Sequence, residues 1–166
     1  MKRTIRVLLL SLLCCFLAGC TTTYHGTADL IEKAREELPI ADADTIELSY
    51  AGQCAREDMA LAWFISGNSY QAHYYLPISF HIVGDNAYTF HHTYKPINRA
   101  MDIAVLHWNG GCSFLINNPE CTAVRITDDT GTYEITIEKG AYPYVFYRDL
   151  LPSEYIFLDS DGNEIS

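Results

Sequence analysis

The sequence predicts a mainly β protein, an antiparallel β-sandwich of about eight short strands with one N-terminal helix. Three observations predict this class. Apolar and polar residues alternate with a period of two over much of the chain, turn-forming residues separate these segments, and aromatic residues make up 13% of the sequence. Short alternating strands separated by turns are typical of sandwiches and barrels, because each strand buries one face. Of these two, we favour the sandwich.

One amphipathic helix is expected over residues 28–38. Helix-forming residues fill this stretch, Thr27 can serve as its N-cap, and Pro39 ends it. Apolar side chains recur here every four residues, so they share one face. They are Leu30, Ala34 and Leu38. This helix leads into the β domain.

Two early segments differ in how clearly they can be assigned. Residues 45–50 alternate between polar and apolar side chains, with Ile46, Leu48 and Tyr50 on the apolar face, which indicates a half-buried strand. Residues 60–65 are apolar without interruption. Such a run fits either a buried strand or the end of a helix, and periodicity alone does not separate the two.

The clearest pattern is a hairpin formed by residues 70–83 and 87–95. All even-numbered positions of its first strand are apolar, and Pro77 is expected to bend or divide that strand. A three-residue loop, Gly84-Asp85-Asn86, sets apolar side chains opposite each other, whereas a two-residue loop would set apolar against polar. The predicted pairs are Ile82 with Tyr88, Phe80 with Phe90 and Ile78 with His92, and on the other face His81 with Thr89 and Ser79 with His91.

A second hairpin joins residues 122–126 to residues 132–137 through the turn Asp128-Asp129-Thr130-Gly131. A four-residue loop again makes the apolar faces agree. The predicted pairs are Ile126 with Tyr133 and Val124 with Ile135. Three further strands are expected at residues 103–108, 142–147 and 155–158.

The N-terminal segment has the layout of a secretion signal. A basic head with Lys2, Arg3 and Arg6 precedes the almost wholly apolar residues 7–18, a run too short to cross a bilayer as a permanent helix. The run ends in Leu17-Ala18-Gly19-Cys20. This motif resembles the lipobox of bacterial lipoproteins, in which the cysteine is lipidated and becomes the mature N-terminus.

That resemblance implies that residues 1–19 are a cleaved signal peptide. Cys20 would carry a diacylglyceryl thioether and a further acyl chain such as palmitate, which together hold a protein stably on a membrane. Thr21 stands where an aspartate would resemble the inner-membrane retention signal. The resemblance therefore favours the outer membrane, facing the periplasm, over the inner membrane. Residues 20–27 would be a lipidated tether and residues 28–166 a single sandwich domain with its N-terminal helix.

Charge limits the choice of partner. Loss of residues 1–19 removes three positive charges and moves the formal net charge from −10 to −13. An acidic body argues against binding nucleic acid and against lying flat on anionic lipid. It suits a basic protein partner or metal cations, but solubility alone would also explain the acidic charge.

Cysteine usage follows from the same compartment. Two of the six cysteines lie in the expected signal segment and Cys20 would be lipidated, which leaves Cys54, Cys112 and Cys121. In an oxidising compartment one disulfide is expected among them. Cys112 and Cys121 bracket the loop-forming residues 117–120 and are the expected pair, with Cys54 as the alternative partner. A zinc site built from the three thiolates lacks the usual Cys-x-x-Cys spacing.

Histidines form the candidate metal site. The predicted register puts His81 and His91 diagonally opposite, about 7 Å apart on the solvent-side face. His73 lies further along the same strand face, so zinc or copper could bind here. The alternative interpretation is an ordinary polar surface. His92 lies on the aromatic face, where we expect a hydrogen-bonded core residue.

No catalytic residue is predicted. Cys112 has His107 nearby in the sequence, but an expected disulfide removes its thiol from nucleophilic chemistry. Residues 159–163 have the alternating oxygen-bearing side chains of a calcium loop, but their glycine is misplaced. We therefore predict plain turns there and at residues 128–131.

Three classes of function remain. The favoured class is a non-enzymatic protein-binding lipoprotein, in particular an immunity or inhibitor protein against a toxin or hydrolase that attacks the envelope. The second is an accessory or assembly lipoprotein of an envelope machine. The third is a metal-binding or enzymatic lipoprotein that uses the surface histidines. The acidic single domain without a catalytic motif fits the first class.

Overall fold

The structure, a computed structural model of the chain, describes residues 22–39, 43–67, 74–98 and 101–165. Within these residues the protein is mainly β and its strands pair antiparallel, as predicted. The elements are β1 (Thr23–His25), α2 (Gly26–Glu36), the 3-10 helix η1 (Ala43–Thr45), β2 (Leu48–Arg56), β3 (Met59–Ser66), β4 (Tyr74–Gly84), β5 (Ala87–Thr93), β6 (Ile103–Trp108), β7 (Gly111–Ile116), β8 (Ala123–Asp128), β9 (Gly131–Thr136), β10 (Tyr144–Arg148) and β11 (Glu154–Leu158). No helix in these ranges is long and apolar enough to span a bilayer.

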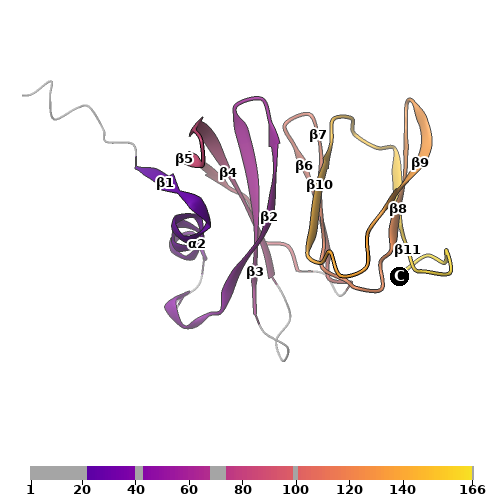
Figure 1. Cartoon of the computed structure of the whole chain (residues 1–166), viewed down its shortest axis with the longest axis horizontal. Helices are drawn as coiled ribbons and strands as arrows, with labels where there is room; N and C mark the ends of the chain where they lie inside the picture. The colour runs from indigo at the N-terminus through magenta and orange to yellow at the C-terminus, as the bar shows by residue number, and fades with distance from the viewer. Residues whose placement is uncertain (1–21, 40–42, 68–73, 99–100, 166) are drawn as a thin grey trace, which may run out of the picture.

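The strands form three sheets stacked face to face (Figure 1). Sheet A has the order β1-β5-β4-β3-β2, sheet B the order β10-β7-β6, and sheet C the order β11-β8-β9. Helix α2 covers the outer face of sheet A, sheet B lies in the middle, and sheet C forms the far end of the stack (Figure 1). The predicted sandwich is confirmed, and it has one more layer than a two-sheet sandwich.

Strand β3 shows why the apolar run at residues 60–65 has no polar face. Ala62 and Phe64 pack toward α2, while Leu61 and Trp63 pack toward sheet B. Both faces of the strand are therefore buried, and alternation disappears from the sequence. The open choice between a strand and a helix is settled as a strand.

Strand β7 is buried in the same way and is absent from the predicted set. Phe114 packs toward sheet C and Leu115 toward sheet A, and every residue of the strand is buried. Its central place in sheet B explains this burial, since it has a strand on either side and a sheet on either face.

Helix α2 begins two residues earlier than predicted. Thr27 is not its N-cap, because the cap position is His25. The His25 amide instead donates to the Asp29 carboxylate at 2.8 Å. Gly26 has φ of +70°, a conformation open to glycine, and it turns the chain from β1 directly into the helix. Leu30 and Ala34 are buried against sheet A, as expected.

The chain around α2 also differs from prediction on both sides. Thr23–His25, part of the predicted tether, pairs with β5 as the edge strand β1. Ala43–Thr45 forms a 3-10 helix, so the strand predicted over residues 45–50 starts only at Leu48. Thr45 thus ends the 3-10 helix, and Ile46 and Glu47 connect it to the strand.

The first hairpin, β4–β5, keeps the predicted pairs near its turn. Ile82 lies opposite Tyr88 and Phe80 opposite Phe90. The turn itself has two residues, Asp85 and Asn86. Between Ile82 and Gly84, a bulge adds one unpaired residue to β4, which has the same effect on the register as a third loop residue. The pattern of faces is therefore the one expected from a three-residue loop.

A second bulge, at His91, changes the register further along this hairpin. Ser79 lies opposite His92, and Ile78 lies opposite Thr93. The predicted pairs of Ser79 with His91 and of Ile78 with His92 are wrong, because a bulge adds one unpaired residue to β5.

Pro77 neither ends nor divides β4. The carbonyl of Pro77 accepts from the Tyr94 amide at 3.0 Å, beyond the end of β5. The proline's missing N–H therefore falls outside the ladder that joins β4 to β3. The second hairpin, β8–β9, has the predicted pairs of Val124 with Ile135 and Ile126 with Tyr133.

Candidate functional site

The structure brings together two of the three candidate metal ligands. His81 on β4 and His91 on β5 have ring centroids 4.9 Å apart in an edge-to-face arrangement. His73 lies outside the described residues. The diagonal placement predicted from the hairpin therefore holds in space, although the bulge at His91 produces it rather than a regular register.

A hydrogen bond occupies one ring nitrogen of His91, and an acidic side chain lies near His81. The buried Ser79 hydroxyl lies 3.0 Å from His91 Nδ1, and Asp58 Oδ2 lies 3.8 Å from His81 Nδ1. Among the described residues, no group of three or more His, Cys, Asp or Glu side chains is arranged to hold a metal ion. Structural zinc sites use four such ligands, of which the described residues supply this pair, and the metal site stays a prediction.

His92 contradicts its predicted role. Its side chain is exposed, and its ring stands edge-on to Tyr94 with centroids 4.8 Å apart. The bulge at His91 accounts for this, because it shifts every later residue of β5 by one position relative to β4. The prediction of a core histidine depended on a register without that bulge.

The predicted disulfide is not formed. Cys54, Cys112 and Cys121 are all free and buried. Cys54 lies between sheets A and B with its Sγ 3.2 Å from Ser113 Oγ, whereas Cys112 lies on the other side of sheet B. Cys121 shares the cluster of Cys112, but its Sγ is directed to the Ala123 carbonyl at 3.5 Å.

These thiols are poorly suited to nucleophilic chemistry. Burial raises the pKa of all three: Cys54, Cys112 and Cys121. His107 is the cross-strand partner of Cys112, but its side chain is exposed while the thiol is fully buried. A reactive cysteine needs a lowered pKa and access to solvent, and Cys112 has neither.

A polar cluster that the sequence analysis missed lies where β8 turns into β9. Asp128 is 8% exposed. Its carboxylate accepts from the Thr130 amide at 2.8 Å, from the Thr130 hydroxyl, and from the Tyr133 hydroxyl at 2.8 Å. The Thr130 hydroxyl, the Tyr133 hydroxyl and the Thr130 amide together lower the pKa of Asp128. The Arg148 guanidinium lies over the Tyr133 ring, 4.6 Å from its centroid.

This cluster fixes the position of β9 at the end of the stack. The Asp-x-Thr sequence at residues 128–130 is the signal that could have found it, because an aspartate commonly accepts from the backbone two residues on. The partners Tyr133 and Arg148 come from β9 and from β10 in the neighbouring sheet. The sequence analysis predicts only a turn at residues 128–131.

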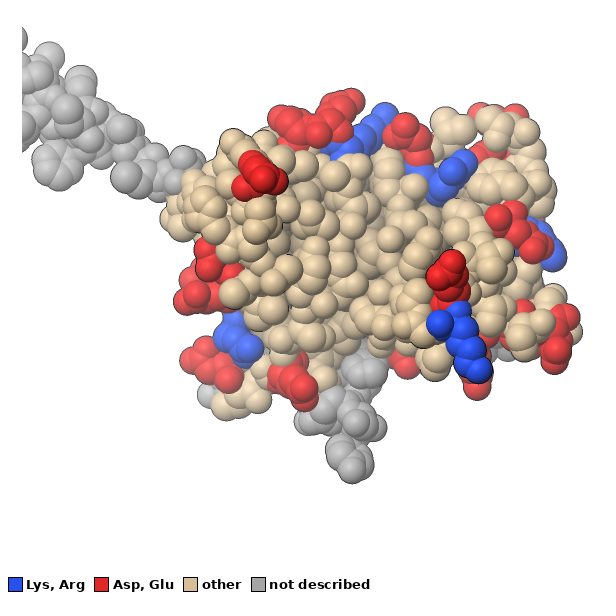
Figure 2. Space-filling model, viewed as in Figure 1, with Lys and Arg blue, Asp and Glu red and all other residues tan. Residues whose placement is uncertain are grey.

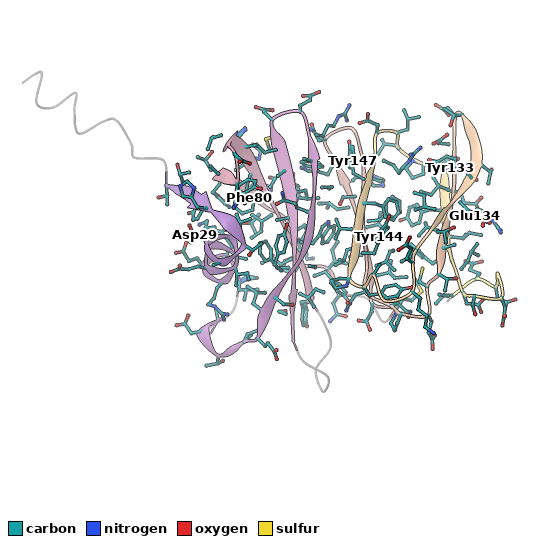
Figure 3. All side chains as sticks on the ribbon, in the orientation of Figure 1. Asp29, Phe80, Tyr133, Glu134, Tyr144 and Tyr147 are labelled. Carbon is teal, nitrogen blue, oxygen red and sulfur yellow. The ribbon has the colours of Figure 1, made fainter. Side chains whose placement is uncertain are left out.

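The outer face of sheet C has no layer over it. Arg125 on β8 pairs with Glu134 on β9 through Nε and Nη2, at 2.8 Å and 2.7 Å from the same carboxylate oxygen. Beside this pair, the hydroxyls of Thr127 and Thr132 lie 3.0 Å apart. Glu134 and Tyr133 are adjacent on β9, at the end of the stack opposite to Asp29 and α2 (Figure 3).

In the view of Figure 2, most charged side chains lie near the outline of the molecule, some lie on its right-hand face, and a broad area over β2 and β10 shows none. A depression of about 530 Å³ lies at the opposite end of sheet C from the β8–β9 turn, lined in part by Glu120, Lys139 and Tyr142. Asp159 also borders it, but its carboxylate already accepts from the amides of Asp161 and Asn163 at 2.9 and 2.8 Å. This loop is a turn closed by its own hydrogen bonds.

No protein-family model matches the chain, and neither a curated protein nor a solved structure matches it at a significant level.

Proposed function

We propose that the protein is a membrane-anchored periplasmic lipoprotein that acts as a non-enzymatic protein-binding module. The lipobox-like motif at residues 17–20 supports the anchor. Cys20 is only three residues from Thr23, where β1 begins, and three residues span at most about 11 Å. Sheet A and α2 would therefore lie close to the membrane surface.

The observation that supports binding is the order of the layers. The described chain starts at the edge of sheet A, and sheet C is the layer farthest from α2 and β1 (Figure 1). A body anchored through β1 thus presents sheet C to the periplasm. The outer face of that sheet is uncovered, and the Asp128 cluster holds its last strand in place.

The partner is a basic protein, in keeping with a net charge of −13 after signal removal. An immunity or inhibitor protein against an envelope-attacking toxin or hydrolase is the form of this function that we favour. Such a protein needs a rigid surface and no chemistry of its own. Raised thiol pKa values at all three described cysteines agree with a role of this kind.

In-cell photo-crosslinking of the full chain tests this function. A photoreactive amino acid at Thr132 on β9 should capture a periplasmic or secreted protein, whereas the same amino acid at the exposed Glu32 on α2 should not. The captured protein is identified by mass spectrometry, purified, and tested for direct binding to the full chain in detergent. Binding through sheet C would be contradicted if the variant with the photoreactive amino acid at Thr132 gave no crosslink, or if the Thr132 and Glu32 variants gave the same crosslinks.

The anchor is tested separately through Cys20→Ser. Loss of metabolic labelling with radioactive palmitate and release of the chain from the membrane fraction are expected. Continued membrane attachment of the variant would contradict lipidation at this cysteine.

A further inference from the structure

We propose that the open edge of β9 binds an extended strand of the basic partner, which joins sheet C as a fourth strand. This inference rests on the proposed binding function and names the surface that performs it. Adding a strand to an exposed sheet edge is a general mode of recognition, in which backbone hydrogen bonds provide affinity and alternate side chains provide specificity.

The hairpin register determines which backbone groups of β9 are open. The Ile137 amide donates to the Thr122 carbonyl at 2.8 Å. In an antiparallel ladder, hydrogen-bonded pairs alternate with non-bonded ones, so Ile135 and Tyr133 also bond to β8. On the residues that alternate with these three, the N–H and C=O groups point away from β8. These residues are Thr132, Glu134 and Thr136, and all three are exposed.

The other sheet edges among the described residues are less open. Strand β1 has three residues and runs straight into α2, and β2 is interrupted by a bulge between Tyr50 and Gly52. Residues 163–165 fold back on β11, where the Ile165 amide donates to the Phe157 carbonyl. These are common ways of protecting an edge from another chain.

The two edges of the central sheet are protected by burial. On β6, the residues whose backbone groups face away from β7 are Ile103, Val105 and His107, and only His107 is exposed. All residues of β10 are partly buried, and β10 packs against β2, with Val145 Cγ2 3.2 Å from where a Cβ would lie on Gly52. Strand β9 has none of these protections: it is six residues long, without a proline, a lysine or a bulge.

Charge indicates the chemistry of the occupant. A second copy of this chain would bring together two bodies that each carry a formal charge of −10, or −13 after signal removal, so self-pairing is disfavoured. On the outer face, Arg125 on β8 and Glu134 on β9 form a cross-strand charge pair, and Glu134 is the member at the open edge. A lysine or arginine opposite Glu134 on the incoming strand would form a second cross-strand pair of opposite charges, which is favourable.

The test uses Thr136→Pro in the full chain. Proline at this position removes an N–H that points away from β8, so it blocks the open edge and leaves the ladder of sheet C intact. Thr136→Ala is the matched control, because it removes the same side chain and keeps the N–H. The probe is the synthetic peptide acetyl-Thr-Val-Thr-Lys-Thr-Val-Thr-amide, tested alongside the partner captured through Thr132.

For both ligands we expect Thr136→Pro to weaken binding at least tenfold and Thr136→Ala to change it less than twofold. Replacing the lysine of the peptide by glutamate should also weaken binding. A peptide N-methylated on alternate residues should not bind, a result that holds even if the proline variant folds poorly. In NMR spectra of the wild-type chain, the peptide should slow hydrogen exchange of the Thr132, Glu134 and Thr136 amides.

The outcomes separate this inference from the proposed function. Equal binding of the captured partner to the wild type and to Thr136→Pro, or no effect of N-methylation, would overturn strand addition at β9 while binding through sheet C remained. Absence of any partner captured through Thr132 would overturn the proposed function itself.

Discussion

The indole of Trp63 on β3 donates a hydrogen bond to the hydroxyl of Ser113 on β7 at 2.8 Å, and both side chains are fully buried between sheets A and B. Cys54 Sγ lies 3.2 Å from the same hydroxyl. Ser113→Ala would leave the indole N–H buried without this acceptor. We expect the free energy of unfolding to fall by about 1–3 kcal/mol, measured by urea denaturation.

Ser49→Ala provides the control for this variant. The Ser49 hydroxyl is on an exposed part of β2 and lies 3.5 Å from the Ile65 carbonyl, a long contact. Its removal should change stability by less than about 0.5 kcal/mol. Equal effects of the two substitutions would mean that the Trp63–Ser113 bond does not join the sheets.

Gly111, the first residue of β7, has no room for a side chain. A Cβ there would lie 2.0 Å from the Arg148 carbonyl oxygen and 2.5 Å from the Tyr147 hydroxyl. Gly111→Ala should therefore push β10 away from β7 and destabilise the fold by about 1–3 kcal/mol or more. Thermal unfolding followed by circular dichroism measures the loss.

Gly84→Ala is the matched substitution, because a Cβ at Gly84 would meet only the Ala87 side chain, at an ordinary 3.5 Å. Its melting temperature should stay close to that of the wild type. If Gly111→Ala melts at the same temperature as Gly84→Ala, the close approach of β10 to β7 is wrong.

The three buried thiols should be protected from alkylation in the folded protein. Burial both raises their pKa and blocks access to the reagent. Under native conditions, iodoacetamide should leave Cys54, Cys112 and Cys121 unmodified in peptide mass spectra. In guanidinium without a reductant, all three should react. A requirement for reductant before Cys112 and Cys121 react would show a disulfide in the isolated protein.

Stability should fall in acid through the Asp128 cluster. Hydrogen bonds from Thr130 and Tyr133 lower the pKa of Asp128 in the folded state. A carboxyl whose pKa is lowered by folding stabilises the protein above its unfolded pKa of about 3.9, and that contribution is lost as the pH falls through the folded pKa. Urea unfolding at a series of pH values below about 4 should show this loss.

The loss should be smaller in Asp128→Asn, which has no carboxylate to protonate. The neighbouring Asp129 is exposed, so Asp129→Asn should keep the acid dependence of the wild type. If the two variants behave alike, the Asp128 hydrogen bonds do not couple pH to folding.

Sequence patterns identified the hairpins because apolar and polar residues alternate along most of each strand. The β8–β9 register and the inner pairs of β4–β5 were predictable, since a slip of one residue would expose every apolar side chain. The same rule fails where both faces are buried. Strand β7 has Cys112 and Phe114 on one face and Ser113 and Leu115 on the other, all buried, so its sequence does not alternate.

The candidate site was predicted less well than the fold, for two physical reasons. A bulge such as that at His91 leaves no clear mark in a sequence rich in β-forming residues, yet it reversed the environment of His92. The edge of β9 depends on which strands flank it, which follows from long-range packing. The position of Tyr133 beside Arg148 likewise needs β10 from the adjacent sheet.

The three residue pairs between β1 and β5 have a mechanical consequence. A pull on the N-terminal end, directed away from the edge of sheet A, would act first on Thr23 and then on each following residue of β1, so these hydrogen bonds would break one after another. Release of three residues would lengthen the connection to a membrane anchor by about 10 Å. Strands β2 to β5 would remain paired, so in the lipid-anchored protein that we propose β1 would be an extensible link between anchor and domain.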